Sequence, residues 1–234
     1  MDGKLVGKED EALKREIIVT IDGPAGSGKS TVSKALAKRL SYLYLDTGAL
    51  YRAVAYLIGR EGFSGNDEQE LYDLLKGADI VLQKSGDVLK VHVNGEDVTG
   101  HLRTEEIGLR ASKISALPLI RELLLPIQRK VGASGGIVAE GRDMGTVVFP
   151  GADVKFFLDA SESERIQRRF VELSNRGDGI PYGDIARDMR HRDLQDRERT
   201  VAPLRPHEDA VIIDTSRMTI AEVVEAMLGI INDS

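Results

Sequence analysis

The segment Gly23-Pro24-Ala25-Gly26-Ser27-Gly28-Lys29-Ser30 has the residue types and spacing of a phosphate-binding loop. Glycines let backbone N–H groups approach phosphate oxygens without a side-chain clash. Lys29 would reach the β- and γ-phosphates, and the Ser30 hydroxyl would take one position on a bound Mg²⁺. A kinase, a GTPase-like switch and a motor ATPase all remain open. The residues expected to bind the triphosphate are Gly23, Pro24, Ala25, Gly26, Ser27, Gly28, Lys29, Ser30 and Thr31.

A second group of reactive side chains follows the next strand candidate, at Asp46-Thr47-Gly48-Ala49-Leu50-Tyr51-Arg52. In a parallel sheet this segment lies at the carboxyl edge, where ligands bind. Thr47 is expected to cap the following helix, with Tyr51 and Arg52 about one turn later. A hydroxyl, an aromatic face and a guanidinium suit a second phosphate-bearing ligand. A capped surface helix with a solvated arginine is the alternative.

A third group, Glu140-Gly141-Arg142-Asp143-Met144-Gly145, follows another strand candidate and lies at the same predicted edge. Packing alone does not explain a glycine-flanked Arg-Asp pair at this position, which favours a ligand site. The alternative is a turn with a surface ion pair, which would contribute little energy.

The stretch from Arg165 to Arg205 contains ten arginines and many carboxylates. Such a charge run is typical of a solvated helix with ion pairs between successive turns. Phosphoryl transfer provides the competing interpretation, because guanidinium groups stabilise its dispersed negative charge and a mobile lid excludes water. Arg192, Asp196 and Arg199 fall at i, i+4 and i+7, so they share one helix face. Most of these arginines are expected to be structural and two to four functional, and the catalytic candidates are Lys29, Arg168, Arg169 and Arg192.

These side chains need a parallel sheet to bring them together. Apolar, β-branched runs predict buried strands, and helical spacing of apolar residues follows them. The predicted fold is α/β, with a parallel-sheet phosphate-loop core flanked by helices and an arginine-rich helical lid at about 162–200. The expected strands are 17–21, 42–45, 137–139, 154–158 and 211–214, and capping boxes are expected at Ser161 with Glu164 and at Thr219 with Glu222.

The segment from Ile80 to Val98 interrupts this alternation. A turn near Lys84–Asp87 and the hairpin signal Asn94-Gly95 predict three short antiparallel strands. We expect them to form a small inserted lobe at about 64–116, separate from the main sheet. Helices are expected at about 104–115 and 118–131.

Composition limits the remaining possibilities. The 234 residues carry a formal charge of −6, which argues against a nucleic-acid coat protein. The absence of cysteine excludes disulfides and a cysteine nucleophile. No apolar run approaches the ~20 residues that span a bilayer, and the polar extension 1–16 lacks a signal core. We expect a cytoplasmic monomer without a membrane or a nucleic-acid polymer as partner, and the scattered histidines indicate no metal site.

Several motifs together resemble one family, the bacterial-type cytidylate kinases. They are IDGPAGSGKST, DTGALYR, the insert ending in NGEDVTGHLRTEEI, EGRDMGTVVFP and DRERTVAPL, so that the resemblance extends from about Ile17 to the C-terminus. The insert and EGRDMGTVVFP discriminate this family from other nucleoside monophosphate kinases, which share the loop and the core. A kinase for UMP or AMP and a nucleotide-dependent switch remain the alternatives.

The resemblance implies transfer of the γ-phosphoryl group of ATP to CMP or dCMP, with Mg²⁺ as cofactor and the insert as monophosphate-binding lobe. It implies that Asp143 accepts from the cytosine N4 amine while Arg121, Arg199 and Ser112 donate to O2 and N3, a pattern that uracil would not match. It also implies that Arg192 and Asp196 meet the ribose and phosphate. The full set expected to bind the acceptor is Thr47, Tyr51, Arg52, Ser112, Arg121, Arg142, Asp143, Arg192, Asp196 and Arg199.

Overall fold

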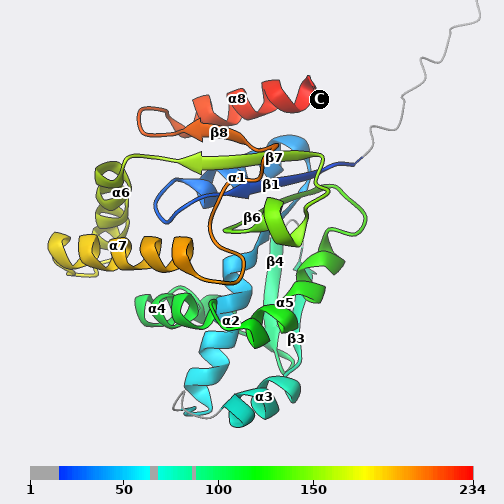
Figure 1. The fold of residues 1–234 in the computed structure, drawn as a ribbon, viewed down its shortest axis with the longest axis vertical. Helices are drawn as coiled ribbons and strands as arrows, with labels where there is room; N and C mark the ends of the chain where they lie inside the picture. Colours follow the sequence, from blue (N-terminus) through cyan, green and yellow to red (C-terminus); the bar gives the residue numbers. More distant parts are fainter. Residues whose placement is uncertain (1–15, 64–67, 86–87, 234) are drawn as a thin grey trace, which may run out of the picture.

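The computed structural model describes residues 16–63, 68–85 and 88–233. The predicted extension 1–16 and the tip of the predicted turn at 86–87 therefore lie outside the described residues, apart from Glu16. Two sheets organise the fold, and Figure 1 shows the larger one in the upper half of the molecule and the smaller one below it. Within the described residues, no helix has the length and apolar content needed to cross a membrane.

The larger sheet is parallel throughout and has the strand order β2-β6-β1-β7-β8. Its central strand β1 reaches Asp22, directly before the phosphate loop, and pairs with β6 and β7. All strands therefore present their carboxyl ends at one edge, which confirms the predicted α/β class. The strands are β1 (Ile18–Asp22), β2 (Leu43–Asp46), β6 (Ile137–Gly141), β7 (Val154–Asp159) and β8 (Val211–Asp214).

Helices cover both faces of this sheet. On one face, Leu36 of α1 and Met227 of α8 pack with the sheet residues Ile21 and Phe156 in one buried cluster. On the other face, Leu45 packs with residues of the short turn η2. These elements are α1 (Lys29–Leu40), α8 (Ile220–Asn232) and the π-helical turn η2 (Met144–Val148).

A second core lies below the sheet, in the lobe that the insert was predicted to form. Its buried residues include Leu57 of α2, Val91 of β4 and Leu124 of α5. The three antiparallel strands are confirmed, whereas the boundaries 64–116 stay a prediction. The elements are α2 (Thr47–Arg60), α3 (Glu68–Lys76), β3 (Ile80–Ser85), β4 (Val88–Val93), β5 (Glu96–Asp97), η1 (Thr99–His101), α4 (Glu105–Ile114) and α5 (Pro118–Val131).

The arginine-rich stretch forms two helices, α6 (Glu162–Asn175) and α7 (Tyr182–Glu198). In Figure 1 they project from the sheet beside α4, and Ser112 of α4 lies within 3.4 Å of Gln195 of α7. The helices that were predicted to form a lid thus contact the lobe.

The two predicted capping boxes differ. Thr219 and Glu222 form the complete reciprocal box at α8. Ser161 accepts from the backbone N–H of Glu164, but the box is incomplete there. The Glu164 carboxylate instead accepts from Arg168, and the Ser161 N–H donates to a serine hydroxyl, so this part of the prediction was wrong.

Candidate active site

The phosphate loop needs glycine at three positions because of backbone conformation and close packing. Gly23, Gly26 and Gly28 have φ angles of 150°, 75° and 88°. A Cβ atom on Gly23 would lie 2.0 Å from the carbonyl oxygen of Leu158 in β7. Gly28 ends the loop in the left-handed region and directly precedes α1, whose amino terminus therefore faces the loop. This geometry is that of an anion cradle.

Lys29 lies buried beneath the loop. Its Nζ donates to the carbonyl oxygen of Pro24 over 2.7 Å. Burial lowers the pKa of Lys29 to about 7, and the positive charge of Arg142 acts in the same direction. Lys29 and Arg142 therefore repel each other when both are charged. An anion bound between them would offset this repulsion.

Asp46, at the carboxyl end of β2, caps helix α2. Its carboxylate accepts from the N–H of Ala49 over 3.0 Å and pairs with Arg52 at 2.8 Å. The expectation that Thr47 caps this helix was wrong, because Thr47 is already its first residue. The Thr47 hydroxyl instead donates to the backbone oxygen of Glu140 over 2.7 Å and ties the start of α2 to β6.

Glu140, at the end of β6, faces the loop. Its carboxylate accepts from the Ser30 hydroxyl over 2.9 Å and from the Tyr44 hydroxyl. Burial raises the pKa of Glu140, and the charge of Asp46 acts in the same direction. A serine hydroxyl and a carboxylate at this edge are oxygen donors of the kind that Mg²⁺ prefers beside phosphates, so the residues fit that ion.

Asp143 lies between two arginines. Arg121 of α5 donates to its carboxylate, and a nitrogen of Arg199 lies 3.8 Å from its other oxygen. Tyr51 lies under Arg121, with the guanidinium carbon 5.7 Å from the ring centre. Burial raises the pKa of Asp143, while the two arginines oppose that shift. Side chains from α5, from the end of α7 and from α2 thus gather around one carboxylate.

Two of the three residues predicted to share a helix face, Arg192 and Asp196, lie on α7, whereas Arg199 is the residue after its last turn and has an extended backbone. Asp196 accepts from Arg142 over 2.8 Å and lies 3.9 Å from Arg199. Arg192 has no ion pair among the described residues, and its Nε atom is buried without a hydrogen-bond partner. Burial lowers the pKa of Arg192, and the charge of Arg142 adds to this effect. An unpaired guanidinium here indicates a site that receives an anion.

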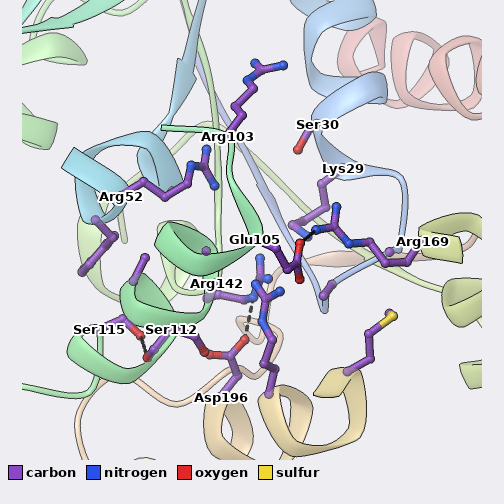
Figure 2. A pocket seen from close by; sticks show the side chains of 18 of the residues that line it. Lys29, Ser30, Arg52, Arg103, Glu105, Ser112, Ser115, Arg142, Arg169 and Asp196 are labelled. Atoms are coloured by element: carbon purple, nitrogen blue, oxygen red, sulfur yellow. Dashed lines mark hydrogen bonds and ion pairs between the residues drawn. The ribbon is translucent and has the colours of Figure 1, made fainter. Parts of the chain in front are cut away.

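These side chains line one cavity of about 340 Å³. Figure 2 shows Lys29 and Ser30 on one side and Ser112, Arg142 and Asp196 on the other. Arg168 does not line the cavity, because it bonds to Glu164 and Thr215. The expected residues that do line it are Ala25, Gly26, Lys29, Ser30, Tyr51, Arg52, Ser112, Arg121, Arg142, Asp143, Arg169, Arg192, Asp196 and Arg199, whereas Gly23, Pro24, Ser27, Gly28, Thr31 and Thr47 lie outside the lining.

The helices α6 and α7 close the cavity against the lobe. Arg169 of α6 pairs with Glu105 at the start of α4, as Figure 2 shows. Arg176 donates to the backbone oxygen of Arg103 over 3.4 Å. The structure therefore has the two halves of the site in contact.

Sequence reasoning missed three carboxylates of this region. Glu140 belongs to the motif Glu140–Gly145, which was selected for its Arg-Asp pair. Its position at the end of a predicted strand could have indicated that Glu140 also faces the site. Glu105 lies in the segment HLRTEEIG, where nothing distinguishes it from a residue of a helix's first turn. Asp22 lies 4% exposed at the end of β1, and the preceding apolar run gave no indication of its partners.

Comparison with known proteins gives the same assignment over nearly the whole chain. A model of the cytidylate kinase family matches residues 19–233. Cytidylate kinases from Geobacter sp. (strain M21) and Citrifermentans bemidjiense are 50% and 49% identical over 211 residues, which are 90% of this chain and 91% of each relative. The enzyme from Vibrio parahaemolyticus is 48% identical over 90% of this chain and 93% of its own length. The chain belongs to the cytidylate kinase family.

Proposed function

We propose that this cytidylate kinase transfers the γ-phosphoryl group of ATP to CMP or dCMP within the cavity between the phosphate loop and the lobe. The observation that carries the assignment of the site is the unpaired Arg192, which lines the same cavity as Lys29 and Asp143. The phosphate loop and the unpaired cation suit the phosphates of the donor. The buried carboxylate suits a cytosine base.

The donor is held at the phosphate loop. Backbone N–H groups and the amino terminus of α1 receive the phosphates, and Lys29 pairs with them as a positive charge. Ser30 and Glu140 would hold Mg²⁺, which when bound neutralises phosphate charge. The loop packs closely against Leu158 of β7 and Arg165 of α6, which hold its shape before the donor arrives.

The acceptor base is recognised at Asp143. Its carboxylate accepts from the N4 amine of cytosine, and Arg121, Arg199 and Ser112 supply donors to O2 and N3. Uracil would place its O4 carbonyl against the carboxylate and leave buried groups unpaired. This mismatch is the physical basis of the proposed specificity.

The remaining arginines of the cavity act on the transferred phosphoryl group and on the acceptor phosphate. Arg142, Arg169 and Arg192 line the cavity beside the loop and would stabilise the negative charge on the equatorial oxygens. Asp196 orients Arg142, and Arg52, held by Asp46, would meet the acceptor phosphate. A catalytic role of Arg168 stays a prediction, because this arginine lies outside the cavity lining. No covalent intermediate is needed, since positioning and charge stabilisation suffice.

The test is release of ADP from ATP with CMP, dCMP, UMP or AMP as acceptor. We expect slow turnover without acceptor and a large increase with CMP or dCMP. A preference for UMP or AMP would refute the assignment of Asp143. Hydrolysis of ATP that ignores added CMP would instead indicate a nucleotide-dependent switch.

A further inference from the structure

Asp22 is a buried carboxylate that the mechanism above does not use. Its two oxygens accept from consecutive backbone N–H groups, those of Met144 and Gly145, over 2.8 Å each. Met144 and Gly145 begin the turn η2 (Met144–Val148), which directly follows Arg142 and Asp143. Strand β1 is therefore tied by a side chain to the loop that carries the proposed base-binding residue.

The sheet alone does not hold this loop. The pairing of β1 with β6 ends where Asp22 lies opposite Gly141, so Arg142 and Asp143 lie beyond the last ladder position. The first N–H groups of a helical turn have no partner inside the turn and need an acceptor from outside. Asp22 provides that acceptor from a strand more than a hundred residues earlier in the chain.

Asp143 itself stands at the position that normally provides the cap. Aspartate is among the preferred residues there, because its carboxylate can accept from the N–H group two or three residues later in its own turn. Here the Asp143 side chain makes no such bond, although its backbone oxygen accepts from Val147 and Val148. Its carboxylate turns instead to Arg121 and Arg199. Of the two N–H groups that it could have capped, those of Gly145 and Thr146, the Gly145 N–H is already bonded to Asp22.

We propose that Asp22 is a positioning residue for acceptor recognition, which caps the turn η2 in place of Asp143 and so leaves the Asp143 carboxylate free to bind the base. This inference rests on the proposed role of Asp143. Without the Asp22 carboxylate, the N–H groups of Met144 and Gly145 lose their acceptor, and Asp143 rotates back to cap its own turn. The variant then binds CMP as weakly as a protein without Asp143.

The test is steady-state kinetics at pH 8 of the wild type and of Asp22→Asn, which keeps the volume but only one acceptor oxygen. Burial raises the pKa of Asp22 to about 6, so the carboxylate is ionised at pH 8. We expect the KM for CMP to rise about 10- to 100-fold, the effect of losing one hydrogen bond to a charged group. The KM for ATP should stay within about threefold, because the phosphate loop is held by other contacts.

Thr20→Val is the matched control. Thr20 is also buried on β1, and its hydroxyl lies near Gly145 but has no hydrogen-bond partner among the described residues. This variant should keep the wild-type KM for CMP. An equal loss in Thr20→Val would mean that packing beneath the loop, and not the carboxylate, is what matters.

A double-mutant cycle separates positioning from a general structural role. Asp22→Asn combined with Asp143→Ala should be no worse for CMP than Asp143→Ala alone, since Asp22 acts through Asp143. Additive losses, an unchanged KM for CMP in Asp22→Asn, or parallel rises of both KM values would overturn the inference. Failure of the wild type to prefer CMP would instead overturn the proposed function.

Hydrogen exchange tests the cap without any Asp22 variant. The amide protons of Met144 and Gly145 should exchange slowly in the wild type and equally slowly in Asp143→Ala, because Asp22 holds them in both. Fast exchange in the wild type, or exchange that becomes fast only in Asp143→Ala, would contradict the assignment of Asp22 as the cap of η2. This experiment therefore tests the cap even if Asp22→Asn fails to fold.

Discussion

Nucleotide binding should be coupled to uptake of a proton by Lys29. Burial lowers the pKa of Lys29 to about 7 in the free protein, so at pH 8 the amine is roughly 90% neutral. Phosphates beside the amine favour its charged form, so that binding transfers about 0.9 proton to the protein at pH 8. At pH 8, one unit above this pKa, protonating the amine costs about 1.4 kcal/mol. Above pH 8 the affinity for ATP should therefore fall about tenfold for each further pH unit.

The assay is isothermal titration of ATP into the protein at pH 8 in Tris and in HEPES, without magnesium. The difference between the two apparent enthalpies, divided by the difference between the ionisation enthalpies of the two buffers, gives the number of protons exchanged. Lys29→Ala is the control and should exchange none, besides losing turnover while keeping its fold. Equal enthalpies in both buffers for the wild type, or unchanged uptake in Lys29→Ala, would refute the reasoning.

Three further substitutions test separate parts of the account. Arg192→Met should lower kcat about 100- to 1000-fold without lowering the melting temperature, because the guanidinium has no partner among the described residues; a kcat within a few-fold of wild type would contradict this. Gly23→Ala should lower the free energy of unfolding in urea by about 2–4 kcal/mol, since its Cβ would meet the Leu158 oxygen. Gly151→Ala, with open space around it, is the control that should lose nothing comparable. Asp46→Ala should lose about 1 kcal/mol of stability, and Asp46→Asn less, because asparagine still caps α2; equal losses would mean that the cap is not the cause.

Features encoded locally could be predicted from the sequence. The apolar run before Gly23 and the spacing after it predicted the strand, loop and helix that the structure contains. Asn94-Gly95 predicted the hairpin between β4 and β5, since both residues adopt positive φ angles there. The cap of α8 at Thr219 was also predictable, because all its partners lie within one turn. The family resemblance, drawn from five motifs, is confirmed by the family match over residues 19–233.

Features that depend on sheet register could not be predicted. Glu140 reaches Ser30 only because β2, β6 and β1 align their carboxyl ends, and the register places Asp46 opposite Glu140. The cap of α2 was assigned to Thr47 although Asp46 is the cap, because threonine and aspartate are both good caps. The choice depends on whether the helix begins one residue earlier or later, which the sequence does not resolve. The partners of Asp22 lie more than a hundred residues away, which no local pattern reports.

The measurement that tests the central claim most directly is the ratio of kcat/KM for CMP to kcat/KM for UMP, in the wild type and in Asp143→Ala. The account predicts a ratio of about 100 or more in the wild type, because uracil would leave buried groups of the site unpaired. It predicts that the ratio collapses towards about 1 in Asp143→Ala, mainly through a loss with CMP. A wild-type ratio near or below 1, or a ratio that Asp143→Ala leaves unchanged, would contradict the assignment of base recognition to this carboxylate.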